Sequence, residues 1–187
     1  QSREEARAVL LAAVAAARAG IAPLTIVSCG HRASLRGTSG DLEPLVVDLV
    51  GRENAGLLAS AAFVPLPPAV LPSTAGGAQE RAYALDLWAR ANAFSLIAGT
   101  SRSGILAYCA TSRRQGLLPA TTQVVVLADT FAVQDLLDRD QLLDRPDLLM
   151  EEALEKAALA ACTRVLAPSA EVLETCAALE PSIAERA

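Results

Sequence analysis

The chain's single histidine lies in a loop whose composition suits anion binding. His31 follows the apolar run Leu24–Cys29 and shares the segment GHRASLRGTSG with Arg32 and Arg36. Backbone N–H groups and arginines in such a loop can bind a phosphate or a carboxylate, and imidazole titrates near neutral pH. An ordinary solvated loop has the same composition, so both interpretations stay open. One histidine does not define a Ser-His-Asp or Cys-His set.

Further polar residues come directly after the apolar runs FSLIAG and TQVVVLA, and these are Thr100, Ser101, Arg102, Asp129 and Thr130. Arg102 precedes a predicted helix, where a cation opposes the helix dipole unless an anion is bound. We therefore take Arg102 as the principal candidate for ligand binding. Ser101 or Ser103 is predicted to be an N-cap or a ligand contact, and Asp129 either caps the next segment or accepts a hydrogen bond from a substrate hydroxyl.

A pair of arginines in the segment GILAYCATSRRQGL is predicted to be structural. Arg113 and Arg114 fall at the end of an apolar, helix-spaced stretch, and Gly116 follows them. Arginines near a helix C-terminus interact favourably with the helix dipole and with free carbonyl groups, and the glycine supplies the left-handed turn. This position is also at the wrong edge of a parallel sheet for a ligand site.

Acidic residues gather on one predicted helix, which begins at Pro146. Glu152 and Lys156 have the i,i+4 spacing of a surface ion pair. The same pattern predicts a solvated helix face for Glu151, Glu152 and Glu155.

Helices and apolar runs alternate along most of the chain. The first helix is predicted over residues 3–19, from the capping box of Ser2 and Glu5 to Gly20. Strands are predicted at Leu24–Cys29, Leu45–Val50, Ser95–Ala98, Val124–Ala128 and Arg164–Ala167. Further helices are predicted at Gln79–Ala93, in a broken stretch over Phe131–Leu143, from Pro146 onward, and after the N-cap Ser169, with a short one near 53–63. Prolines and glycines make residues 64–78 a connection.

Apolar strands that alternate with helices predict an α/β fold, a Rossmann-like parallel sheet with helices on both faces, over one domain of residues 1–187. Ligands in such folds bind beyond the carboxyl ends of the strands, which is where the polar residues above lie. The chain lacks the G-x-G-x-x-G turn of common dinucleotide sites. It begins with a helix, so we expect the first strand of the doubly wound unit to come from outside these residues.

Composition excludes several classes of protein. The formal net charge is −5 and aromatic residues make up 3% of the chain, which argues against nucleic-acid binding. Four cysteines lie far apart, so we expect neither a metal site nor a disulfide. Buried, reduced thiols and the absence of a membrane-length apolar run predict a cytoplasmic location.

Three segments, FSLIAGTSRSGILAYCATSRRQGL, TQVVVLAD and MEEALEKAALAACTRVLAPSAEVLE, follow one another in this chain. Their order resembles the N-terminal half of group 1 (family 4) glycosyltransferases of the GT-B fold. In that family an RRQGL-like turn precedes a VVV strand, and a helix of the ERxxLExAD kind leads into a VVAPS strand and another helix. The resemblance spans about Phe94–Leu179, and residues 1–93 contribute compatible architecture.

The resemblance implies one half of a GT-B architecture, the acceptor-binding domain of an enzyme that transfers a sugar from a nucleotide-sugar donor to a sugar or glycan acceptor. It implies no metal and no cofactor beyond the donor. The partner would be a C-terminal donor-binding domain after Leu179, without which we expect this domain to be inactive. His31, Arg32, the segment Thr100–Arg102, Asp129 and Thr130 are then the candidate substrate-binding residues.

Two departures from the family favour an alternative. Histidines that members often carry are replaced here by Gly99-Thr100-Ser101 and Ala128-Asp129-Thr130. The alternative is a non-catalytic α/β binding or assembly domain derived from that family. An apolar surface left by a missing partner would favour self-association in either case. A third possibility is an unrelated flavodoxin-like or phosphate-binding domain that uses the His31 loop. A second α/β domain beyond Ala187 would favour the enzyme.

Overall fold

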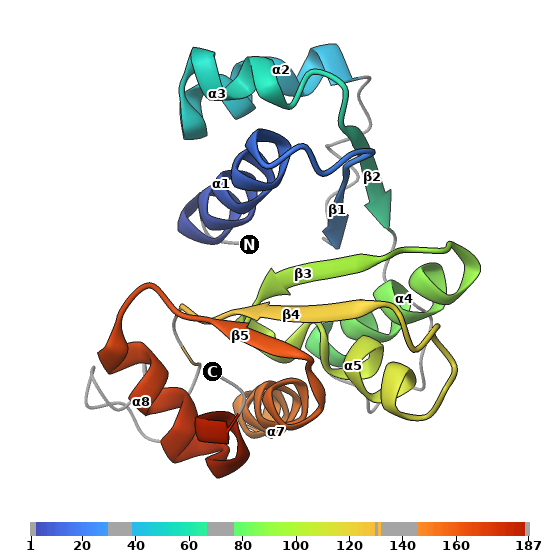
Figure 1. Cartoon of the computed structure of the whole chain (residues 1–187), viewed down its shortest axis with the longest axis vertical. Coiled ribbons are helices and arrows are strands. Elements are labelled where there is room, and N and C mark those ends of the chain that lie inside the picture. The colour runs from blue at the N-terminus through green and yellow to red at the C-terminus, as the bar shows by residue number, and fades with distance from the viewer. Residues whose placement is uncertain (1–2, 30–38, 67–76, 130, 132–145, 186–187) are drawn as a thin grey trace. The chain divides into compact units, whose positions relative to one another are not determined.

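The computed structural model describes residues 3–29, 39–66, 77–129, 131 and 146–185 (Figure 1). The chain divides into two compact units, Gln1–Pro67 and Pro68–Ala187. Each unit is described by itself below. The assignment of residues 1–187 to one glycosyltransferase domain stays a prediction.

The described residues of unit 1 form two parallel strands and three helices. In chain order these are α1 (Arg3–Arg18), β1 (Thr25–Cys29), α2 (Ser39–Val50), α3 (Arg52–Leu57) and β2 (Ala62–Leu66). The strands pair in register from Thr25 opposite Ala62 to Cys29 opposite Leu66. The predicted first helix is confirmed, and Gly20 ends it with φ 76°. Ile21 N–H donates to the carbonyl of Ala16 at 3.0 Å, which satisfies a carbonyl of the last turn.

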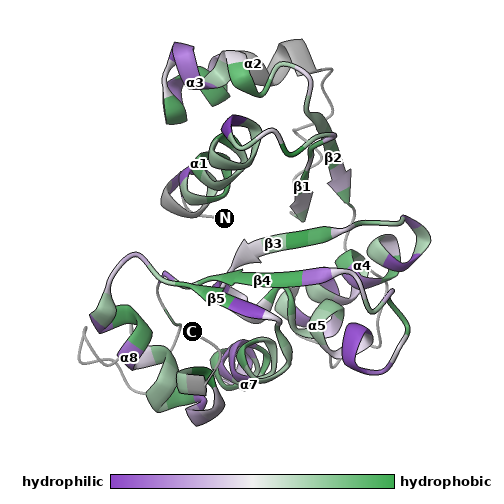
Figure 2. Cartoon of the chain, in the orientation of Figure 1, coloured by the Kyte–Doolittle hydropathy of each residue, from purple (hydrophilic) through white to green (hydrophobic). Residues whose placement is uncertain are grey.

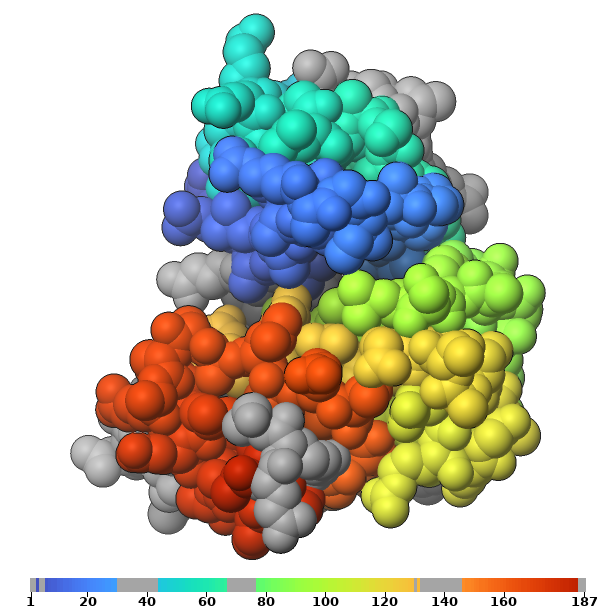
Figure 3. All heavy atoms as spheres, viewed as in Figure 1, coloured from blue at the N-terminus to red at the C-terminus, as the bar shows by residue number. Residues whose placement is uncertain are grey.

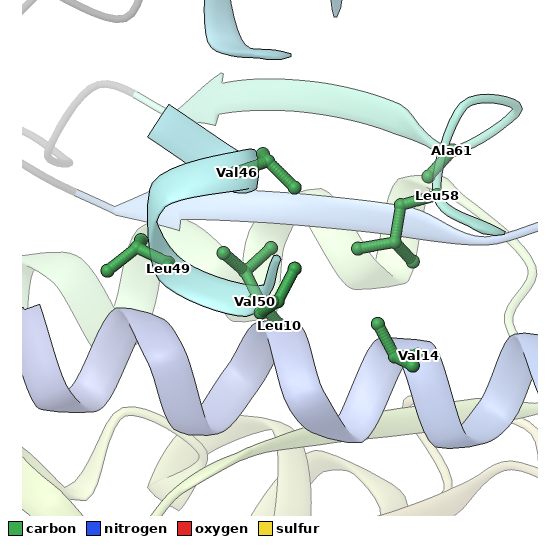
Figure 4. Packing of buried hydrophobic residues seen from close by; sticks show 7 residues of the cluster. All are labelled: Leu10, Val14, Val46, Leu49, Val50, Leu58 and Ala61. Carbon is green, nitrogen blue, oxygen red and sulfur yellow. The ribbon is translucent and has the colours of Figure 1, made fainter. Parts of the chain in front are cut away.

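The core of unit 1 forms where α1 packs against α2 and α3. Seven buried residues converge there (Figure 4): Leu10, Val14, Val46, Leu49, Val50, Leu58 and Ala61. The space-filling view shows α1 in blue directly against the cyan atoms of α2 and α3 (Figure 3). Burial of apolar side chains of this size, about 1.5–3 kcal/mol each, stabilises the unit.

The strand predicted at Leu45–Val50 is wrong, because these residues form the end of helix α2. Val46, Leu49 and Val50 are buried, whereas Leu45 and Asp48 are exposed. The buried positions follow the i, i+3, i+4 spacing of a helix face rather than the alternation of a strand. Tertiary contact with α1 therefore overrides the strand preference of the valines.

The connection predicted over residues 64–78 is wrong at its start, because strand β2 extends to Leu66. Pro65 lies within β2, opposite Ser28 of β1. Proline lacks the N–H needed in the middle of a sheet, but it is tolerated in a strand that is paired on one side. β1 and β2 form a two-stranded sheet, separate from the three-stranded sheet of unit 2. The described residues therefore contain two sheets, whereas a single sheet was expected.

In unit 2, the part of the chain that the structure describes forms three parallel strands in the order β3-β4-β5. Its elements are α4 (Gly77–Ala91), β3 (Leu96–Thr100), the 3-10 turn η2 (Arg102–Gly104), α5 (Ala107–Arg114), β4 (Gln123–Leu127), α7 (Pro146–Ala161), β5 (Arg164–Leu166), α8 (Ala170–Leu179) and the 3-10 turn η3 (Pro181–Glu185). The predicted strands of this half and their parallel pairing are confirmed. The predicted N-cap is also confirmed, since the Ser169 hydroxyl accepts a hydrogen bond from Val172 N–H at 3.3 Å.

One face of the β3-β4-β5 sheet is covered by helices. Helices α4, α5 and α7 lie along this face (Figure 1). Val124 and Val126 are fully buried, and a Cβ added to Gly99 would lie 3.3 Å from Leu106 Cγ, at the start of α5. Hydrophobic residues fill most of β4 (Figure 2). Parallel strands flanked by helices confirm the Rossmann-like α/β class.

Candidate functional site

The carboxyl ends of β3 and β4 bring together several of the polar residues predicted from the sequence. Thr100, the last residue of β3, pairs with Leu127 of β4. Ser101 N–H donates to the carbonyl of Leu127 at 3.0 Å, and the Ser101 hydroxyl accepts a hydrogen bond from Asp129 N–H at 3.2 Å. Thr100, Ser101, Arg102 and Asp129 therefore meet at one edge of the sheet, as parallel strands require. Their role in substrate binding stays a prediction.

The rest of the predicted site lies outside the described residues. This applies to the loop with His31, Arg32 and Arg36, to Thr130, and to the helical stretch predicted after Phe131. The candidate site is accordingly the edge formed by Thr100–Gly104 and Asp129, which we call the β3–β4 edge.

Serine N-caps were predicted at this edge, and the structure corrects this. Ser101 has right-handed helical angles and makes no capping hydrogen bond, because its hydroxyl holds the start of the segment after β4 instead. Ser103 has φ 59° and ψ 11°. Regular helix resumes only at Ala107, after Leu106, whose side chain gives no capping bond. The turn therefore separates the strand from the helix N-terminus.

The η2 turn is held closely against helix α7. Gly104 has φ 57°, and a Cβ added there would lie 2.3 Å from the carbonyl carbon of Leu154 and 2.6 Å from the nitrogen of Glu155. Only glycine combines this left-handed backbone with so close an approach to another main chain. The turn is thus fixed by backbone packing as well as by hydrogen bonds.

Glu155 was predicted to lie on a solvated helix face, and this is wrong. Its exposed fraction is 2%, and its Oε1 accepts a hydrogen bond from Ser103 N–H at 2.9 Å. Glu155 shares the buried face of α7 with Ala158 and Leu159, at the i, i+3 and i+4 spacing that would have revealed it. The surface ion pair of the same helix is confirmed, with Lys156 Nζ 2.6 Å from Glu152 Oε1.

The buried Glu155 carboxyl group changes the electrostatic surroundings of Arg102 at the β3–β4 edge. Arg102 was expected to need an anion because a cation near a helix N-terminus opposes the dipole. Arg102 is half-buried in η2, and Glu155 supplies an acidic group to the same turn from within the chain. The position of Arg102 therefore does not by itself require an external anion.

A second buried polar cluster, between α4 and α5, was missed by the sequence reasoning. Asp86 is completely buried, and its Oδ2 pairs with Arg90. Arg90 Nη2 also donates to the Ser112 hydroxyl at 2.9 Å. Asp86 Oδ1 has no hydrogen-bond partner among the residues described. Asp86 follows Ala82 by four residues on the alanine-rich buried face of α4, and this spacing was the available signal.

Arg113 and Arg114 are structural, as predicted, but the hydrogen bonds of their side chains go to other segments and not to the carbonyls of their own helix. Arg113 Nε donates to the carbonyl of Thr122 at 2.7 Å, and its Nη2 donates to that of Ala120 at 3.2 Å. Arg114 Nη1 donates to the carbonyl of Ala160 at 3.4 Å. These bonds fix the turn before β4 and the end of α7 rather than the arginines' own helix. They lie at the amino ends of the strands, opposite the candidate site.

All four cysteines are in the reduced thiol form. Burial raises the pKa of the Cys176 thiol and the charge interaction with Cys162 raises it further, while a backbone hydrogen bond lowers it. In the described part of the chain, no group of three or more His, Cys, Asp or Glu side chains could hold a metal ion. Across those same residues, the helices are all too short or too polar to span a bilayer.

No family model, curated protein or solved structure matches this chain. The class that the fold defines is therefore an α/β protein with parallel strands flanked by helices and a polar carboxyl edge. Its function has to be argued from that edge, because a fold of this class supports many activities.

Proposed function

We propose that this chain is the acceptor-side domain of a GT-B glycosyltransferase, which transfers a sugar from a nucleotide-sugar donor to a sugar or glycan acceptor. A C-terminal domain would bind the donor, and the enzyme would act in the cytoplasm without a metal or a further cofactor. The proposal rests on the family resemblance of Phe94–Leu179 and on the geometry of the β3–β4 edge.

The observation that carries the proposal is the meeting of Arg102 and Asp129 at the carboxyl ends of adjacent parallel strands. The hydrogen bond from Asp129 N–H to the Ser101 hydroxyl, at 3.2 Å, joins the two segments. Asp129 is half-buried, and in the proposed enzyme its carboxylate would accept hydrogen bonds from sugar hydroxyls. A guanidinium offers planar donors to a carboxylate or a phosphate. Ligands of α/β folds bind at this edge.

Sugar transfer by the full-length protein tests the proposal. Uridine- and guanosine-diphosphate sugars would be supplied as donors with a panel of mono- and disaccharide acceptors. Arg102→Ala should raise the KM of acceptor or donor, or lower kcat, by about tenfold, the effect of losing one charge-assisted hydrogen bond. Arg113→Ala is the control, because Arg113 bonds to carbonyls at the opposite edge. Equal, small effects of both substitutions would refute the assignment of Arg102.

A non-catalytic binding or assembly domain is the second candidate, and a specific observation favours it. The Ser101 hydroxyl and the Glu155 carboxyl both bond to the protein's own backbone at the edge. Histidines common in the family are also absent from 99–101 and 128–130. Sugar binding without transfer by the full-length protein, or a coding sequence that does not continue into a donor domain, would favour this candidate.

A further inference from the structure

We propose that Glu155 is a positioning residue of the candidate site, which holds the η2 turn and thereby places Arg102 at the β3–β4 edge. Its effect on sugar binding rests on the proposed function. Its effect on the turn is independent of any substrate.

Contact between Glu155 and the turn is direct and buried. Ser103 N–H donates to Glu155 Oε1 at 2.9 Å, across 52 positions of sequence. Glu155 is 2% exposed, so water competes little for this bond. An acidic acceptor makes a stronger hydrogen bond to a backbone N–H than a neutral one does. The residue after Arg102 is therefore anchored to helix α7.

Backbone strain marks the turn as unusual. Ser103 is the one residue other than glycine with a positive φ among those that the structure describes. A side chain other than that of glycine is sterically strained in the left-handed region. Strain of this kind persists only where surrounding contacts impose it, and it occurs most often at functional sites. Here the imposing contacts come from Glu155 and from the neighbouring Leu154, against which Gly104 packs.

The two ends of the turn are also fixed. Gly104 N–H donates to the carbonyl of Ser101 at 3.1 Å, and Ser101 N–H continues the sheet to Leu127. The Ser101 hydroxyl then holds Asp129. Arg102 thus lies in a short loop anchored to β4 on one side and to α7 on the other. Release of the Ser103 bond would free the segment that carries Arg102.

Amide hydrogen exchange on the full chain tests the positioning without a substrate. Glu155→Ala should speed the exchange of the Ser103 amide about tenfold or more relative to the Val126 amide in β4, because the Ser103 N–H loses its buried acceptor. Glu155→Gln, which keeps an acceptor oxygen and the side-chain volume, should restore part of the protection. If Glu155→Ala speeds the exchange of both amides by the same factor, the substitution has only lowered the general stability, and the proposal is overturned. Unchanged exchange at Ser103 in both variants would also overturn it.

Transfer kinetics of the full-length protein test the link to Arg102. If Glu155 acts through Arg102, Glu155→Ala and Arg102→Ala should raise the same KM, Glu155→Gln should raise it less, and the double alanine variant should be no worse than Arg102→Ala alone. Losses that multiply in the double variant would show a separate, merely structural role and overturn the proposal. Absence of transfer in the wild type would refute the proposed function, and the exchange result would then decide the role of Glu155.

Discussion

Replacement of Gly104 by alanine should destabilise unit 2 more than the same replacement at Gly116. Both glycines are left-handed, with φ 57° and 75°, so each alanine costs about 1–2 kcal/mol of backbone strain. Only Gly104 lies against other atoms, since its Cβ would be 2.3 Å from two carbons of Leu154, whereas nothing lies within 4 Å of a Cβ at Gly116. Overpacking of this kind costs a further 1–3 kcal/mol or so. The expected losses are about 2–5 kcal/mol for Gly104→Ala and about 1–2 kcal/mol for Gly116→Ala.

Urea unfolding followed by tryptophan fluorescence measures this difference. Trp88 is the chain's single tryptophan and lies on α4 of unit 2, with its ring 4.9 Å from that of Phe94. With a urea slope of about 1–3 kcal/mol per molar, the additional loss at Gly104 should lower the midpoint by about 1 M. The reduced entropy of the unfolded chain is the same for both alanines and cancels. Equal midpoints for the two variants would refute the close packing of η2 on α7.

Three further predictions concern the stability contributed by polar and titratable side chains of unit 2. Arg113→Ala should cost about 1.5–3 kcal/mol in urea unfolding, because two carbonyls lose a charged donor, while Arg114→Ala, with one long bond at an exposed position, should cost under about 1 kcal/mol; similar losses would contradict this. Arg90→Met should cost about 3–5 kcal/mol because it leaves Asp86 buried without its cation, and adding Asp86→Leu should recover much of that loss; an additive double variant would be the contrary result. Because burial raises the folded-state pKa of the Cys176 thiol above an unfolded value of about 8.5, the folded state keeps its proton longer. The free energy of unfolding should therefore keep this contribution in full below about pH 8.5 and fall above it until the folded-state pKa is reached, by at most about 1.4 kcal/mol per pH unit. Cys176→Ala should make this fall smaller. If the pH dependence of the unfolding free energy is the same in Cys176→Ala as in the wild type, the raised pKa of Cys176 is contradicted.

The strands of unit 2 could be predicted because their residues carry the signal themselves. The run from Val124 to Val126 is continuously apolar and all three residues are buried, as expected for a central parallel strand. The end of the helix at Gly116 could also be predicted from the residue itself, because the φ of 75° at this position favours glycine. Local chemistry was sufficient at both places.

The errors fall where a distant segment decides the outcome. The valines of α2 favoured a strand, and only the apolar face of α1 makes their helical spacing the better solution. Pro65 indicated a connection, although a strand paired on one side accepts proline. The residues of α2 and of β2 do not by themselves indicate which segment will pack or pair with them.

The candidate site was predicted in part for the same reason. The meeting of Thr100–Arg102 with Asp129 followed from the parallel strands, and the hydrogen bond to Ser101 confirms that they are adjacent. Glu155 was assigned to solvent because Lys156 and Glu152 suggested a charged surface. Its burial depends on the approach of Gly104, which comes from 51 residues earlier in the chain. On the helix itself, the signal was the i, i+3, i+4 spacing of Glu155 from Ala158 and Leu159.

Chemical-shift mapping of the chain with saccharides tests the central claim, that the β3–β4 edge binds sugar. Mono- and disaccharides would be titrated at millimolar concentration into the nitrogen-15-labelled chain while backbone amide signals are recorded. We expect saturable shifts at Thr100–Gly104 and Asp129, weakened by Arg102→Ala, with the amides of residues 113–122 at the opposite edge unaffected. Shifts confined to the opposite edge, or none at the β3–β4 edge with any of the sugars, would contradict it.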